Sequence, residues 1–438
     1  MFNTIKSFFL NDNYVKKIIL FGFIYRLILS ALYLSVTLYP MSNNFKFLTS
    51  ILGNFAFEHY TGERTFGYPL FMAFCLNNII AVMITQFFIG IITWVFWYKT
   101  LKNLNFSPKN SFLITLFTGS FIHIFFYETA VMYETLILFF VSWIFYLLSD
   151  GFLEKKNKKT DWLMFALVGY LTFIKPFFIF IPCLIYGFSV LKDFSFKKVF
   201  SHKIIVLFSG FLVYFGWSYV NKIHTGHFVS STFFGLNTAQ NCVHFAENTT
   251  DQYKELGQIY AYHREQTIRE NKDIAMSIWY GRDDIKAVTG IDYFPDYSAY
   301  LGEYAKATIA LNKEQYIKQI ITISWVNFWD NEIHWDYLSF PNKFSETFFK
   351  TIWKIQYPIL ITFKVIFLLL IPLYLFRFLK TKKITFELIT ICIVSAASVL
   401  QAIVTFGNNA RFSFPFEYLM IFVVCMIIKD IRNKILKK

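Results

Sequence analysis

Charged residues are scarce in this sequence. Only 16% of the 438 residues are Asp, Glu, Lys or Arg, whereas 56% are hydrophobic and 21% are aromatic. One soluble core cannot hide that much apolar surface, and so few charged side chains cannot cover it. The composition therefore excludes an ordinary soluble globular protein, and it indicates a chain whose surplus apolar surface contacts lipid.

Cysteine is also rare, with five residues in the whole chain. Cys75, Cys183, Cys392 and Cys425 lie in or beside apolar segments, and no CxxC or CxxH spacing occurs. The sequence therefore indicates neither a disulfide framework nor a zinc site.

Basic residues outnumber acidic ones by 42 to 28, for a net charge of +14. They form short clusters between apolar runs, which is the pattern of cytoplasmic loops between membrane spans and not of a nucleic-acid-binding surface. Nucleic acid is therefore not an expected partner. The clusters at Lys16 and Lys17 and at 429–438 place both termini in the cytoplasm.

The fold class that follows is an all-α polytopic membrane protein with about ten transmembrane helices. Continuous apolar runs favour helices over a barrel, because lipid cannot satisfy an exposed backbone and barrel strands alternate in polarity. The ten expected spans are 17–39, 79–98, 111–127, 131–149, 162–174, 177–191, 204–222, 355–377, 384–405 and 412–428.

The spans divide the chain into three parts. Residues 1–222 form an N-terminal transmembrane module of seven spans with an outer loop at 40–78, residues 223–351 form a small extracytoplasmic domain, and residues 352–438 form a C-terminal module of three spans. We expect a re-entrant or interfacial helix at Tyr68–Leu76, helical structure within 300–329 and a turn at 294–296.

Ionisable residues gather on the outer side of this topology, where a charge beside hydrocarbon usually serves a function. Lys175 forms an outer turn with Pro176. The other members of the set come from the first outer loop and from the outer ends of two spans, and they are Glu58, His59, Glu63, Arg64, Glu128, Glu134 and Arg411. A carboxylate that accepts a proton and cations that hold a phosphate would suit sugar transfer from a lipid phosphate, although transporters line cavities with the same residue types.

Five segments in order resemble motifs of the GT-C superfamily of membrane glycosyltransferases. The similarity is to the bacterial group that includes protein O-mannosyltransferases and the lipid A aminoarabinose transferase. The segments are RTFGYPLFMAF, YETLILFF, LTFIKPFFIFIP, FGWSYVNKIHTGHFVSSTFFGLNTAQN and NARFSFPFEYLMIF, which begin at residues 64, 133, 171, 215 and 409.

The resemblance implies an inverting transferase in a bacterial inner (plasma) membrane. Its donor would be a sugar on polyprenyl phosphate, and its acceptor an envelope glycan, lipid or protein at the outer face. Glu58 or Glu134 is the expected base. Arg411 and Lys175 are expected to bind the donor phosphate, with Arg64, His59 and Glu63 also in the site.

The chain departs from that family at one informative place. Where such enzymes carry an acidic residue soon after the first span, this sequence has Asn43 and Asn44. Glu58, the first carboxylate of the same loop, is therefore the expected substitute.

Two other functions stay open on the sequence alone. A glycan polymerase of the O-antigen type would use the same leaving group, and a transporter or flippase would use similar residues. No motif requires a cofactor. The expected outer domain contains Asp283, Asp284 and Asp292, so a divalent cation remains an open alternative as a cofactor, although these acids lack EF-hand spacing.

Overall fold

The computed structural model describes residues 11–192, 194–407 and 410–436, so the last two residues of the basic tail lie outside it. The described residues form helices and connecting loops but no β-strand, and one isolated β-bridge joins Thr37 to Ala130. This arrangement confirms the expected all-α class.

Five described helical segments are long and apolar enough to cross a membrane, which indicates a membrane-embedded protein. They centre on α5 (Ile79–Asn103), α12 (Ile204–Thr225), α20 (Lys343–Thr381), α21 (Phe386–Val404) and α22 (Glu417–Ile435).

Helices α6 (Pro108–Gly119) and α7 (Ile122–Thr129) are bent by 61° at the short break between them. If this bent pair is counted as one broken span, it makes a sixth crossing. The expected number of ten is not confirmed. The remaining apolar helices are short or carry charges: α8 (Glu134–Ser149) has 16 residues, and α2 (Asn13–Tyr33) contains Lys16, Lys17 and Arg26.

The turn at Lys175 and Pro176 is confirmed. Helix α9 (Lys158–Ile174) ends in front of Lys175, whose backbone is extended, and a 3-10 turn at Pro176–Ile179 leads into α10 (Phe180–Leu191). Proline favours this break because it disrupts the interior of a helix. The short apolar segment expected to be helical forms α4 (Gly67–Phe74), and its position relative to the membrane stays a prediction.

The turn expected at 294–296 was wrong. These residues begin α17 (Phe294–Leu311), and Pro295 sits in its first turn, where a missing N–H removes no helical hydrogen bond. The helical region beyond it is broken after Leu311 into α18 (Lys313–Gln319), a π-helical turn (Ile320–Ser324) and α19 (Trp325–Phe328).

The described helices of the small domain surround their own hydrophobic core. The helices are α13 (Phe233–Gln240), α14 (Lys254–Arg269), α15 (Ser277–Tyr280), α16 (Arg282–Thr289) and α17. The buried core runs from Phe233 to Ala305, with Phe406 added from the C-terminal part. Phe328 and Phe349 belong instead to the large core of the bundle, so the end of the 223–351 segment packs with the bundle.

The shorter described elements connect these helices. They are α3 (Met41–Asn54), α11 (Phe196–Val199) and the 3-10 turns Val243–Phe245, Asp251–Tyr253, Ile274–Met276, Trp335–Tyr337, Ala410–Phe412 and Phe414–Phe416.

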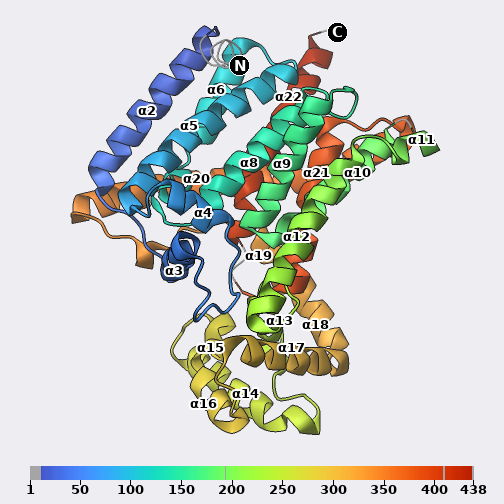
Figure 1. Cartoon of the computed structure of the whole chain (residues 1–438). Helices are drawn as coiled ribbons and strands as arrows, with labels where there is room; N and C mark the ends of the chain where they lie inside the picture. Colours follow the sequence, from blue (N-terminus) through green and yellow to red (C-terminus); the bar gives the residue numbers. More distant parts are fainter. Residues whose placement is uncertain (1–10, 193, 408–409, 437–438) are drawn as a thin grey trace.

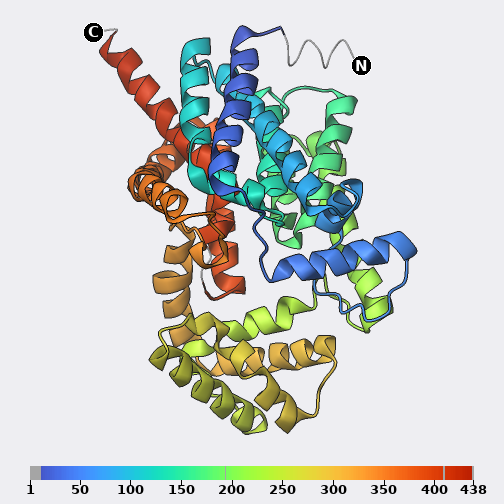
Figure 2. The same cartoon turned by 90° about the vertical axis from the view of Figure 1, so that its left-hand side faces the viewer.

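The small domain lies at one end of the helical bundle, and α12 runs from the bundle towards it (Figure 1). The start of α2 and the end of α22 lie at the opposite end of the bundle, so the two ends of the described chain share a side (Figures 1 and 2). Helix α3 lies across the end of the bundle that faces the small domain (Figure 2).

A third, smaller core fixes the loop that follows α3. Leu48 and Ile51 of α3 pack with Tyr60 and Phe66 of the loop and with Trp217 of α12. The Tyr60 hydroxyl also donates a 2.6 Å hydrogen bond to the side-chain oxygen of Asn221 in α12. The segment between Tyr60 and Phe66 is therefore held at both ends.

Candidate functional site

A cavity of about 310 Å³ lies where the first outer loop, the turn at Lys175 and the start of the small domain meet. Its polar and charged lining residues are Glu63, Arg64, Thr65, Lys175, Ser230, Ser231, Asn237, Gln401 and Thr405. The aliphatic and aromatic part of the lining consists of Phe45, Tyr133, Ile174, Pro176, Phe177, Ile179, Phe180, Tyr214, Phe234, Leu400, Val404 and Phe412. The cavity therefore combines cations, one carboxylate and an extensive apolar wall.

Glu63 and Arg64 are presented to this cavity by a loop whose backbone is hydrogen-bonded on both sides. The Ser231 hydroxyl donates to the Glu63 carbonyl at 2.7 Å, and the Thr65 hydroxyl donates to the Ile174 carbonyl at 3.1 Å. Gly62 has a φ of +70°, a conformation that glycine adopts without strain. Its carbonyl accepts from the Thr232 N–H at 3.0 Å.

The Glu63 carboxylate accepts a 2.6 Å hydrogen bond from the Asn44 side-chain amide. Burial raises the pKa of Glu63, and hydrogen bonds from Thr61 and Asn44 and the charges of Arg64 and Arg282 oppose the shift. A carboxyl with a raised pKa is a better proton acceptor than an ordinary surface carboxylate.

Two cations line the same cavity. The Arg64 guanidinium lies 4.7 Å from the ring centroid of Phe233, and its buried Nε has no hydrogen-bond partner among the described residues. The Lys175 ammonium lies 3.6 Å from the ring centroid of Phe412 and 5.2 Å from that of Tyr133. Because aromatic faces attract a cation without occupying its N–H donors, both side chains can still donate to an anion.

Glu134 begins α8 directly after the cavity-lining Tyr133, and its side chain is buried. Neither carboxylate oxygen has a hydrogen-bond partner among the described residues. Its electrostatic attraction is strongest to Arg411, followed by Lys175 and Arg64. The sequence placed these four residues on one side of the membrane, and the fold brings them into one electrostatic cluster.

Arg411 belongs to the 3-10 turn Ala410–Phe412 and precedes the lining residue Phe412, without lining the cavity itself. It interacts electrostatically with Glu134 and with three tyrosines, Tyr133, Tyr127 and Tyr39. Arg411 thus adds positive charge from behind the wall that carries Lys175.

Glu58 and His59 do not join this group. Both side chains are exposed, and neither lines the cavity. His59 has a φ of +59° in the loop that precedes Tyr60. Their roles stay predictions, and among the expected residues the fold assembles Glu63, Arg64, Glu134, Lys175 and Arg411.

Sequence reasoning missed a buried charged network behind the Arg411 turn. Lys364 of α20 forms a 2.9 Å ion pair with Glu417 at the start of α22. The Lys364 ammonium also donates to the side-chain oxygens of Asn331 at 2.6 Å and Ser413 at 2.7 Å. The available signal was a lysine inside the long apolar run 355–377, because a buried intramembrane charge requires a partner.

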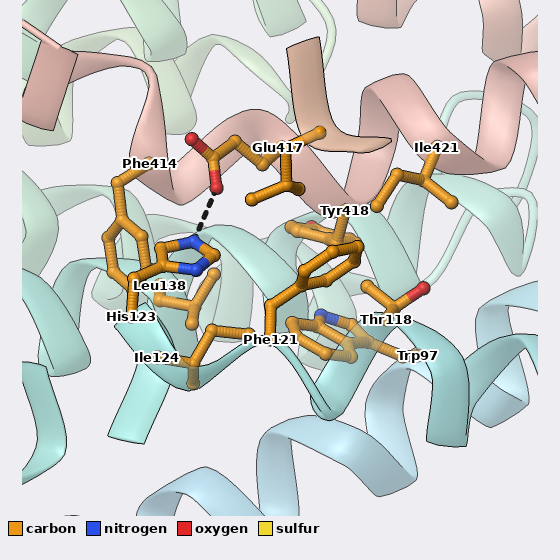
Figure 3. A pocket seen from close by; sticks show the side chains of 11 residues that line it. Trp97, Thr118, Phe121, His123, Ile124, Leu138, Phe414, Glu417, Tyr418 and Ile421 are labelled. Atoms are coloured by element: carbon orange, nitrogen blue, oxygen red, sulfur yellow. Dashed lines mark hydrogen bonds and ion pairs between the residues drawn. The ribbon is translucent and has the colours of Figure 1, made fainter. Parts of the chain in front are cut away.

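His123 completes the network, as its Nε2 lies 2.7 Å from Glu417 (Figure 3). Beside it is a void of about 10 Å³, room for one water molecule, which is lined by His123, Glu417, Thr118, Tyr418 and mostly apolar side chains (Figure 3). His123 is therefore a buried histidine that is hydrogen-bonded to Glu417. The network anchors the turn that carries Arg411 and Phe412.

Glu128, the other acid at the outer end of the bent pair, is buried away from the cavity lining. Its carboxylate forms a two-pronged ion pair with Arg26 of α2, with distances of 2.7 and 2.5 Å. This pair joins α2 to α7 and explains how the first apolar helix tolerates an internal arginine.

Among the described residues, no group of three or more His, Cys, Asp or Glu side chains is placed to hold a metal ion. Two of these acids have side-chain partners, since Asp284 lies 2.7 Å from His263 and Asp292 lies 3.5 Å from Lys286.

Comparisons with known proteins found no matching family model, no similar curated protein and no similar solved structure.

Proposed function

We propose that the chain is a membrane glycosyltransferase that moves a sugar from a polyprenyl-phosphate donor to an acceptor hydroxyl in the 310 Å³ cavity. The observation that carries the proposal is the composition of this one cavity. It holds a carboxylate with a raised pKa and, beside an apolar wall, two cations that have no ion-pair partner within the part of the chain that the structure describes. A donor phosphate with a long hydrocarbon tail complements the cations and the apolar wall. A reacting acceptor hydroxyl complements the carboxylate.

The cations bind the donor phosphate. Arg64 offers forked N–H donors and Lys175 a point charge, and Arg411 adds positive potential from behind the wall. These groups also stabilise the negative charge that develops on the leaving phosphate. Glu134, buried among them, keeps the three cations together without lining the cavity.

Glu63 is the base. Its carboxylate takes the proton of the acceptor hydroxyl while the acceptor oxygen forms a bond to the anomeric carbon. The bond between that carbon and the phosphate oxygen breaks, and its electron pair leaves with polyprenyl phosphate. Attack opposite the leaving group inverts the anomeric configuration. Glu63 suits this role better than Glu58, which is exposed outside the cavity, or Glu134, which lies behind its wall.

The apolar wall accepts the first isoprene units of the donor. It is formed by Ile179 of the 3-10 turn, Phe180 of α10, Tyr214 of α12, and Leu400 and Val404 of α21. Neighbouring positions of α12 and α21 point apolar side chains outwards, with Phe215, Val399 and Ile403 between 44% and 49% exposed. The tail therefore passes from the wall into lipid without crossing a polar surface.

The experiment is a donor-consumption assay on the purified chain in lipid nanodiscs. Undecaprenyl-phosphate donors carrying glucose, mannose, galactose or aminoarabinose are supplied with membrane extract from the source organism as acceptor. We expect one donor to release undecaprenyl phosphate without any ion or solute gradient. A diphosphate-linked oligosaccharide used in preference would identify a polymerase, and vectorial transport without any donor cleavage would contradict the proposal.

A further inference from the structure

A second cavity, of about 220 Å³, lies beside the first one, between the segment 227–238 and α17. Ser231 and Phe234 line both cavities, so one thin wall separates them. The Ser231 hydroxyl on this wall donates to the backbone carbonyl of Glu63. A molecule in the second cavity that extends past Ser231 and Phe234 therefore reaches the carboxylate of the first cavity.

The floor of the second cavity is fixed by a close approach of two helices. At Gly235 of α13, an added Cβ would lie 1.7 Å from the backbone oxygen of Ser298 in α17 and 3.1 Å from the backbone nitrogen of Gly302. The Ser298 hydroxyl accepts from the Leu236 N–H at 3.0 Å. The floor is therefore formed before any ligand arrives.

The rim is tied to both the loop and α17. The Thr232 hydroxyl donates to the Thr61 carbonyl at 2.7 Å, and His227 Nε2 lies 2.7 Å from Asp296. A preformed cavity binds a ligand with a smaller loss of conformational freedom than a mobile loop does.

The charges of the two cavities differ. In the second cavity Lys306 is paired with Glu303 at 2.7 Å, and the cationic form of His227 would be neutralised by Asp296. The first cavity instead presents Arg64 and Lys175 without an ion-pair partner among the described residues. An anionic group therefore favours the first cavity, and the second suits an uncharged ligand.

The remaining lining specifies that ligand further. The hydroxyls of Ser231, Thr232 and Thr238 each donate to a backbone carbonyl, and their oxygens can accept hydrogen bonds from the hydroxyls of a ligand. Phe234 presents an aromatic ring that is 53% exposed. An aromatic face carries partial negative charge and attracts polarised C–H groups. A sugar ring has both features, with hydroxyls around its edge and C–H groups on its face.

We propose that this second cavity binds the acceptor, and that the acceptor is an uncharged carbohydrate whose reacting hydroxyl passes Phe234 and Ser231 to reach Glu63. The inference rests on the proposed function for the role of acceptor, but carbohydrate binding is measurable without turnover. It narrows the acceptor from a glycan, lipid or protein to a neutral sugar unit.

The test is saturation-transfer NMR with the full chain in nanodiscs, and the probes are methyl glycosides of glucose, mannose, galactose and N-acetylglucosamine. We expect at least one glycoside to bind, and Phe234→Ala to weaken it by about tenfold or more, while Phe234→Tyr retains it. Tyr262→Ala is the matched control, because Tyr262 of α14 is an equally exposed aromatic (59%) outside the cavity lining.

An excess of undecaprenyl phosphate separates the two cavities. It should fill the first cavity and leave the glycoside bound. Displacement of the glycoside, unchanged binding in Phe234→Ala, or no binding of any probe would each overturn the inference. If glycoside binding depends on Phe234 but no donor is ever consumed, the carbohydrate site stands and the transferase proposal fails instead.

Discussion

The Asn44 side-chain amide donates a 2.6 Å hydrogen bond to the carboxylate of Glu63. The two residues come from different parts of the first outer loop, since Asn44 lies in α3 and Glu63 lies beyond Tyr60. Asn43 and Asn44 stand where the expected GT-C resemblance implies an acidic residue. The contact places the Glu63 carboxylate beside Asn44.

This contact predicts a pH effect. The amide hydrogen bond favours the charged carboxylate, so Asn44→Ala should raise the pKa of Glu63, which burial already raises. A base works in its deprotonated form, and a higher pKa moves the acidic limb of kcat/KM to higher pH. The pH profile of the variant should lose activity first at the acidic end. An acidic limb that moves to lower pH, or does not move, would show that Glu63 is not the titrating base.

The cations predict a graded loss of donor binding. Lys175→Met removes a point charge from the cavity wall, and donor affinity should fall on the order of tenfold to a hundredfold, as for a lost hydrogen bond to a charged group. Arg411→Gln removes the positive potential behind the wall, and turnover should fall about tenfold, or about 1.4 kcal/mol of barrier. Titration with fluorescent undecaprenyl phosphate measures the first effect, and single-turnover kinetics measure the second.

Charge reversal supplies the contrast to those variants. Lys175→Glu should abolish donor binding, whereas Lys318→Glu changes the same type of residue in α18, outside the cavity lining. Equal donor affinity in these two variants would remove Lys175 from the phosphate site.

The buried Lys364 and Glu417 pair predicts an effect on stability. Lys364→Met leaves the Glu417 charge without its ammonium partner, and breaking a buried pair costs about 3–5 kcal/mol. The double variant Lys364→Met with Glu417→Gln should recover much of this loss, because no uncompensated charge remains. Thermal unfolding in detergent compares the variants, and a single variant as stable as the parent protein would show that the pair contributes nothing.

Sequence patterns located the helices well where apolar runs were long. They predicted ten crossings, of which five or six are supported by helix length and composition. Helices α8, α9 and α10 are shorter than the supported spans, and α2 carries three cations. The expected span 17–39 contains Arg26, but the sequence did not show the Glu128 carboxylate that pairs with it. Periodicity describes one helix at a time, and burial of a charge depends on a partner far away in the chain.

The candidate site was partly predictable from the expected membrane topology. Glu63, Arg64, Lys175, Glu134 and Arg411 share one side of the expected topology, and that was sufficient to group them. The choice among carboxylates needed the fold, since only packing distinguishes Glu63, which lines the cavity, from the exposed Glu58. The sequence did not indicate that the Asn44 side chain donates a hydrogen bond to Glu63.

The topology predicts that the small domain is outside the cytoplasm. Cys242 is fully buried and therefore a poor reporter, whereas Ile268 at the end of α14 is 51% exposed. In a chain otherwise free of cysteine, Ile268→Cys should react with an impermeant maleimide in intact cells. Labelling at this site only after lysis would invert the orientation.

The most direct test of the central claim is the single-turnover rate of sugar transfer by Glu63→Gln, measured beside the matched variant Glu58→Gln. Both changes convert a carboxylate of the same loop into an amide of the same size. The account predicts that Glu63→Gln slows transfer by about 10²- to 10⁴-fold, the usual contribution of a general base, with donor affinity nearly unchanged and with Glu58→Gln at the parental rate. Parental transfer by Glu63→Gln, or the loss of transfer in Glu58→Gln alone, would contradict it.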